Sequence, residues 1–92
     1  MYVLAAKVTL DLLDTNSLKA KRQVSKSLIM KARHKFNASI TEISEQDSLK
    51  VLVIGFSITS SQLFHGKKVL EEIIRFFELS EHASFRTVER YD

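Results

Sequence analysis

Apolar and polar residues alternate at the start of the chain and then recur with a different period. Residues 2–13 alternate one by one, and one side of this segment carries Tyr2, Leu4, Ala6, Val8, Leu10 and Leu12. A period of two predicts a strand with one buried face and one partly solvated face. Across residues 18–36 the apolar positions follow helical spacing and form one stripe, made of Leu18, Val24, Leu28, Ile29, Ala32 and Phe36. We therefore expect a strand, a turn with an N-cap at residues 14–17, and an amphipathic helix that stops at Asn37.

The second half of the chain repeats this succession with one additional strand. Residues 38–43 and 50–59 indicate two strands joined by a turn, and residues 83–91 indicate a last strand. Between them, Ser60 or Ser61 is expected to cap a second helix that runs to about residue 81. The order strand, helix, strand, strand, helix, strand predicts an α+β fold of the ferredoxin-like type. In this fold both helices cover one face of a four-stranded antiparallel sheet.

The composition fits one domain, residues 1–92, and narrows the classes of function. Cysteine is absent, which excludes disulfides, thiolate metal sites and a cysteine nucleophile. No apolar run approaches the roughly 20 residues that span a bilayer. The first residues lack the basic region that opens a secretory signal. We expect a cytoplasmic protein without membrane contact and without a cofactor.

Charge is distributed unevenly along the chain. Between Asp14 and Glu42 there is no acidic residue, yet this interval holds seven of the 14 basic residues: Lys19, Lys21, Arg22, Lys26, Lys31, Arg33 and Lys35. The rest of the chain combines the other seven basic residues with all 11 acids and has a net charge of −4. A solvated helix face normally mixes both signs, so this asymmetry indicates a polyanionic partner.

The first helix arranges these cations in a particular way. Four of them fall within about 60° of one another on a helical wheel: Lys19, Arg22, Lys26 and Arg33. Lys19, Lys21 and Arg22 also occupy the first turns, where the helix dipole makes a surface cation cost roughly 0.3–1 kcal/mol. Cations there favour an anionic ligand, and backbone N–H groups at a helix start bind phosphate themselves. The alternative is an ordinary solvated face.

Lys21 differs from the other cations, because its angular position lies inside the apolar stripe. Its ammonium group must therefore extend past the sheet edge, or reach a carboxylate or a phosphate. We include Lys21 in the predicted phosphate-binding set with Lys19, Arg22, Lys26 and Arg33.

The face of the sheet that the helices leave open suggests a second class of function. Val3, Val51 and Val53 are predicted to make one end of this face apolar. An exposed apolar patch often marks a dimer interface. The sequence therefore also favours a homodimeric protein-interaction module.

Enzymatic functions have less support from the residues. The three histidines are scattered without metal-ligand spacing. Asp11 and Asp14 at the end of the first strand could serve a metal-dependent nuclease, but two aspartates without another metal-binding group more often form a turn and a cap. We therefore expect no catalytic residues and no metal site.

Several segments carry a resemblance to a known family. They are the string Ser17-Leu18-Lys19-Ala20-Lys21-Arg22, the segment Lys35-Phe36-Asn37-Ala38-Ser39-Ile40, and the pair Gln46-Asp47. Together they resemble the YlxP-like family of small bacterial proteins, and the similarity covers nearly the whole chain. The resemblance implies a ferredoxin-like fold and genes often found among those for translation and ribosome maturation. It therefore suggests a ribosome-associated or RNA-binding factor.

One segment departs from the family pattern. Relatives commonly carry a tryptophan shortly after the Gln46-Asp47 pair, whereas this chain has Ser48-Leu49-Lys50. A contact made by that aromatic side chain would be altered or lost here. The leading hypothesis is a non-enzymatic protein that docks on structured RNA, and on ribosomal RNA in particular. It would do so through the phosphate backbone.

Overall fold

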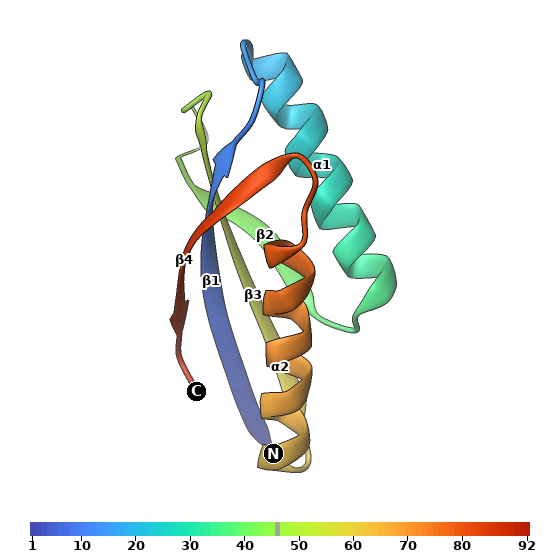
Figure 1. Cartoon of the computed structure of the whole chain (residues 1–92). Helices are drawn as coiled ribbons and strands as arrows, with labels where there is room; N and C mark the ends of the chain where they lie inside the picture. Colours follow the sequence, from blue (N-terminus) through green and yellow to red (C-terminus); the bar gives the residue numbers. More distant parts are fainter. Residues whose placement is uncertain (46) are drawn as a thin grey trace.

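Four antiparallel strands form one sheet, and both helices lie on the same side of it (Figure 1). The computed structural model describes residues 1–45 and 47–92. The elements are β1 (Tyr2–Leu12), α1 (Leu18–Lys35), β2 (Ser39–Ser44), β3 (Val51–Ser60), α2 (Leu63–Glu78) and β4 (Ala83–Arg90). The strand order is β2-β3-β1-β4, and every neighbouring pair is antiparallel. The predicted βαββαβ ferredoxin-like fold is confirmed.

The hydrophobic core lies between the sheet and the helices. Alternate residues of the two central strands face it, and Val8, Leu52 and Ile54 are completely buried. The apolar stripes of the helices close it from the other side with Leu28, Ile29 and Ala32 of α1 and Leu70, Ile73 and Phe77 of α2. The apolar strand face and the apolar helix stripes predicted from the sequence therefore pack together in one core.

The helices cover different parts of the sheet. α1 packs mainly on the edge strand β2, whereas α2 packs on the central strands β1 and β3, and the helices touch each other little. This arrangement leaves a groove between the helices. Because β2 is an edge strand, no strand of the described sheet lies beneath the flank of α1 that faces away from α2. Neither helix of the described residues is both long and apolar enough to cross a bilayer.

Three helix boundaries differ from the sequence predictions. One is the end of α2, which lies at Glu78 rather than at about residue 81. α1 ends at Lys35 with Phe36 as an extended C-cap (φ −121°), one residue before the predicted stop at Asn37, and Asn37 does not adopt the left-handed conformation that asparagine tolerates at such a stop. α2 begins after Gln62 rather than after Ser60 or Ser61. Ser60 pairs with Tyr2 as the last residue of β3, which extends the strand and delays the helix.

Gly66 has a packing role in α2. A Cβ atom at this position would lie 2.7 Å from Leu4 Cδ1 and 3.1 Å from Ser60 Cβ. Leu4 is buried in the core and has little room to move. The glycine therefore allows the first turns of α2 to approach β1 closely.

The open face of the sheet does not carry the predicted apolar patch. Val3 pairs with Thr59, whereas Val51 pairs with Asp11, so these two valines lie at opposite ends of the sheet. Val53 is also only 6% exposed. The prediction that Val3, Val51 and Val53 form one surface is wrong, because antiparallel pairing places the start of β1 beside the end of β3. Homodimerisation itself stays a prediction.

Candidate phosphate-binding surface on the first helix

The start of α1 is held by its own cap and by the loop before it. Ser17 Oγ accepts a hydrogen bond from the Ala20 backbone N–H at 3.0 Å, which satisfies one of the free donors of the first turn. The buried Thr15 hydroxyl donates to the carbonyl oxygen of Leu49. The ammonium of Lys50 donates to the Thr15 carbonyl at 3.2 Å. The helix start is therefore fixed to the β2–β3 connection.

A group of polar side chains beneath α1 holds the helix on the sheet edge. The Lys21 ammonium lies 3.3 Å from Glu42 Oε2 and also donates to the Glu45 carbonyl. Ser25 Oγ donates to Glu42 Oε1 at 3.1 Å. The attraction within an ion pair that is removed from water offsets the cost of desolvation only with such additional hydrogen bonds. These contacts fix how α1 is rotated about its axis, and thus which residues face solvent.

Lys21 consequently does not belong to the predicted binding surface. It is 1% exposed, and its ammonium group is used within the molecule, so the inclusion of Lys21 among the phosphate ligands is wrong. Of the alternatives that its position allowed, it reaches a carboxylate. Sequence reasoning missed Glu42 as that partner, although the signal was present. Glu42 follows Ile40 by two residues on β2, and the alternation of a strand places both on the inward face.

Three other predicted residues of α1 do form a surface. Lys19, Arg22 and Lys26 are all exposed on the flank of the helix beside β2. No carboxylate of the described residues lies within 4.0 Å of their charged nitrogens. At a rise of 1.5 Å per residue the row extends over about 10 Å along the helix. We call Lys19, Arg22 and Lys26 the basic row.

Arg33 lies on the same flank of α1 and also contacts the edge of the sheet. Its guanidinium group donates from Nε and Nη2 to the Ile40 carbonyl, at 3.1 and 2.5 Å. Ile40 belongs to the edge strand β2, so the arginine occupies an acceptor that a foreign strand could use. Three of its five N–H donors are outside these bonds. The structure thus places Arg33 at the end of the basic row, oriented by the sheet edge.

Cations near β4 differ from those of the basic row, because they are paired. Lys7 lies 3.2 Å from Glu89, and hydrogen bonding to this carboxylate raises the pKa of Lys7. Arg90 lies 2.7 Å from Asp92 and 3.5 Å from Glu71. The first turn of α1 contains no acidic residue. Uncompensated positive charge therefore marks α1 rather than the β4 edge.

The aspartates of the nuclease alternative are not arranged around a shared space. The Asp11 carboxylate accepts hydrogen bonds from both Nε and Nη2 of Arg86, and this pairing lowers the pKa of Asp11. Asp14 lies beyond the end of β1 with a left-handed backbone (φ 60°). The described part of the chain contains no group of three or more histidine, aspartate and glutamate side chains suited to a metal ion. Absence of catalysis stays a prediction.

The segment in which relatives commonly carry a tryptophan supports the loop before α1. Gln46 lies outside the described residues, whereas Asp47 is exposed. The Ser48 N–H donates to the Glu45 carbonyl at 3.1 Å, which closes a turn. Leu49 and Lys50 then make the contacts with Thr15 described above. In this chain the segment therefore acts through its backbone and Lys50.

Comparison with known proteins identifies the family. The model of the family described as "Protein of unknown function (DUF503)" matches residues 3–90. The chain belongs to this family. The protein YlxP of Bacillus subtilis (strain 168), described as uncharacterized, is 35% identical over 77 residues, which cover 84% of this chain and 78% of YlxP. The resemblance to the YlxP-like family is thereby confirmed.

Solved structures of similar topology are more distant in sequence. The designed protein Ferredog-Diesel is 17% identical, with a TM-score of 0.41, over 96% of this chain and 84% of its own. A dimeric ferredoxin-like protein from an uncultured marine organism is 11% identical, with a TM-score of 0.46, over 97% of this chain and 92% of its own.

Proposed function

We propose that this protein binds structured RNA by contacting its phosphate backbone with the basic row, Lys19, Arg22 and Lys26. The observation that carries this proposal is the set of exposed cations on α1 without carboxylate partners among the described residues. Arg33 extends the contact at the end of the row. Phosphate contacts position a protein on a nucleic acid with little readout of base sequence. We therefore expect recognition of RNA shape and charge.

The position of the row in α1 supports an anionic ligand. Lys19 and Arg22 lie at the positive end of the helix dipole, where each cation destabilises the free protein. Arg22 and Lys26 are like charges four residues apart, which adds a smaller destabilisation. A bound phosphate backbone reverses both effects, because the anion interacts favourably with the dipole and with the cations.

RNA-binding sheets stack bases on exposed aromatics of the central strands. In β1 and β3, as the structure describes them, the aromatic residues are Tyr2 and Phe56, and strand alternation places both on the face that the helices cover rather than on the open face. Phe56 of β3 is buried and stacks on Phe77 of α2 with ring centroids 5.7 Å apart. This arrangement favours the helix over the sheet. That the RNA is ribosomal is an expectation from the family resemblance, and that the protein works in the cytoplasm is an expectation from the sequence; both belong to the same proposal.

A matched pair of charge reversals tests the proposal. Lys19→Glu with Lys26→Glu changes the basic row, and Lys67→Glu with Lys68→Glu makes the same change in charge on exposed residues of α2. Binding of a fluorescent ribosomal RNA hairpin is measured by anisotropy, and co-sedimentation with ribosomal subunits is measured in parallel. The first variant is expected to bind at least about tenfold more weakly, since each reversed cation loses a phosphate contact and adds repulsion.

The control variant with changes in α2 should retain binding within about threefold, because its charges are screened at a distance from the ligand. Circular dichroism confirms that both variants are folded. Equal weakening by the two variants would show an effect of net charge alone and would contradict the proposal. So would the absence of binding by the wild-type protein at low salt.

A further inference from the structure

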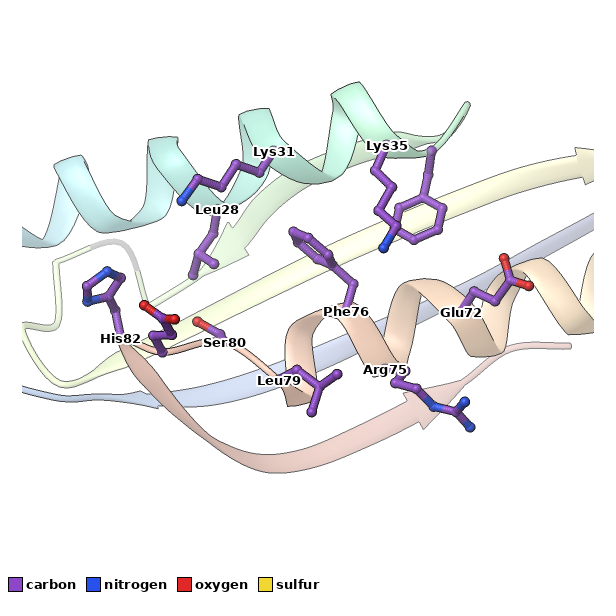
Figure 2. A pocket seen from close by; sticks show the side chains of 11 residues that line it. Leu28, Lys31, Lys35, Glu72, Arg75, Phe76, Leu79, Ser80 and His82 are labelled. Atoms are coloured by element: carbon purple, nitrogen blue, oxygen red, sulfur yellow. The ribbon is translucent and has the colours of Figure 1, made fainter.

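A groove of about 470 Å³ lies between α1 and α2. Its floor is apolar, with Leu28 of α1 and Phe76 of α2, and with Phe36 and Leu79 at the C-caps of the two helices. Figure 2 shows the side chains of Leu28 and Phe76 pointing into the space between the helices. The groove exists because the helices cover different strands and scarcely touch.

Apolar surface faces this groove without a cover from the described chain. Leu79 is 75% exposed, and Phe76 is half-buried. Phe76 packs edge to face against Phe36 at 5.9 Å and against Phe77 at 5.3 Å, so its ring is held in place. A rigid, exposed apolar hollow of this kind is typical of a binding site for another molecule.

The α1 wall of the groove is purely cationic. The Lys35 ammonium lies 5.7 Å from the ring centroid of Phe36 and 5.8 Å from that of Phe76. Lys31 lies one turn earlier on the same wall. Neither lysine has a carboxylate within 4.0 Å among the residues that the structure describes. An anionic group along this wall would be attracted by both.

Charges on the other sides of the groove are mixed and lie away from its middle. Glu72 and His82 occupy opposite ends in Figure 2, and Glu81, which precedes His82 in the chain, also lines the groove. Arg75 belongs to α2 and points away from α1. The middle of the groove therefore combines an apolar floor with a positive wall.

We infer that this groove binds an acidic amphipathic helix of a partner protein. An apolar side chain of that helix enters between Leu28 and Phe76 and covers Leu79. Carboxylates on the neighbouring positions of the partner helix meet Lys31 and Lys35. Helix-in-groove recognition uses this combination of apolar anchors and flanking charges.

The geometry favours a peptide over a nucleotide at this place. Phe76 is nearly perpendicular to Phe36 (83°) and to Phe77 (81°), so the rings form no parallel slot into which a base could stack. The groove also lies on the opposite side of α1 from the basic row. Lys26 and Lys31 are separated by about 140° around the helix at about 100° per residue. The two surfaces can therefore bind different partners.

The test uses a synthetic acidic amphipathic peptide of about 15 residues, with leucines at helical spacing and glutamates beside them. Its affinity is measured by anisotropy, and its location by changes in the amide NMR signals of Lys31, Lys35 and Phe76. Lys31→Glu with Lys35→Glu is expected to weaken binding about tenfold or more, since each exposed pair contributes modestly and reversal adds repulsion. Leu79→Ser, an exposed position, should weaken it about fivefold by removing apolar contact.

Matched controls separate this site from general attraction to a basic protein. Lys19→Glu with Lys26→Glu should leave peptide affinity within about twofold, although it is expected to weaken RNA binding. A scrambled peptide of identical composition should bind at least about tenfold more weakly, because its leucines do not share one face. Equal binding of the scrambled peptide, or equal weakening by both lysine pairs, would overturn the inference. So would oligouridylate, rather than the peptide, shifting the Phe76 signal.

Discussion

Lys21 shows how one residue can determine the direction in which a helix presents its charge. Its ammonium pairs with Glu42 beneath α1 and donates to the Glu45 carbonyl. The apolar stripe and this pair together fix the rotation of the helix, so Lys19, Arg22 and Lys26 face solvent. The same residue type therefore has a structural role at position 21 and a proposed binding role at positions 19 and 26.

Replacement of Lys21 by methionine should destabilise the fold by about 3 kcal/mol, because it leaves the Glu42 carboxylate without its ammonium partner. Lys19→Met, on the exposed flank, should change stability by less than about 0.5 kcal/mol. Urea unfolding followed by circular dichroism measures both. Under conditions in which Lys21→Met remains folded, RNA affinity should be unchanged. A stable Lys21→Met variant that loses RNA binding would show that the ammonium acts at the surface.

The Asp11–Arg86 pair predicts how stability depends on pH. Hydrogen bonds from Arg86 lower the pKa of Asp11 in the folded state. A lowered pKa means that the unfolded chain takes up the proton first as pH falls, so the stabilisation is present at neutral pH and is lost in acid. Asp11→Asn should therefore flatten the decline of the urea midpoint between about pH 5 and pH 2.

Arg86→Gln serves as the partner control for this prediction. It removes the hydrogen bonds that lower the pKa of Asp11, so it should flatten the pH dependence in the same way. The double variant should add little to either single change, since both remove one interaction. Additive effects of the two substitutions would mean that the pair does not act as a unit.

At the scale of single residues, sequence reasoning identified the exposed cations but not their partners. Helical spacing alone placed Lys21 within the apolar stripe, which is where it lies. Strand alternation also puts Glu42 on the inward face of β2, but which residue of α1 it meets depends on how the helix lies over the strand. The contact of Arg33 with the Ile40 carbonyl was equally inaccessible, since it depends on which backbone groups remain free at the sheet edge.

Among the elements, α1 has an N-cap that stabilises the helix, but the charges of its first turns destabilise it. Ser17 caps the helix, yet no acidic residue follows in the first turn. Natural helices gain stability from acids at this end and lose it from cations. The distribution of charge in α1 is therefore explained by a ligand better than by folding.

Neutralisation of the basic row should consequently separate stability from binding. Lys19→Gln, Arg22→Gln and Lys26→Gln together should raise the free energy of unfolding by about 1 kcal/mol, as repulsion with the dipole and between neighbours is removed. The same variant should bind RNA more weakly. Thermal unfolding and anisotropy measure the two effects. A loss of stability would show that these cations support the fold, against the proposed role.

Periodicity predicted the types and order of all elements, because each one buries a face. The residues at which the helices begin and end were predicted less well from the sequence. The start of α2 was expected at Ser60 or Ser61 on capping preference, but Ser60 continues the pairing of β3 with β1. Sheet hydrogen bonds thus compete with a local cap, and the helix begins one or two residues later than expected. The end of α1 likewise depends on the chain entering β2 rather than on Asn37.

Over the whole molecule, α1 lies above the sheet edge and presents cations on two sides. One side carries the basic row, and the other lines the groove with Lys31 and Lys35. The sequence predicted the charge of this helix but not its division between two surfaces, because that requires the position of α2. The prediction of a valine patch was wrong for a similar reason. Alternation assigns Val3 and Val51 to one face, whereas their separation depends on strand register.

The salt dependence of RNA affinity tests the central proposal most directly. For four phosphate contacts, by Lys19, Arg22, Lys26 and Arg33, the logarithm of the association constant should fall against the logarithm of salt concentration with a slope of about −3. In the variant with Lys19→Glu and Lys26→Glu the slope should approach about −1.5, since two contacts are lost. A flat dependence for the wild-type protein, or the same slope in both proteins, would contradict RNA binding by this helix.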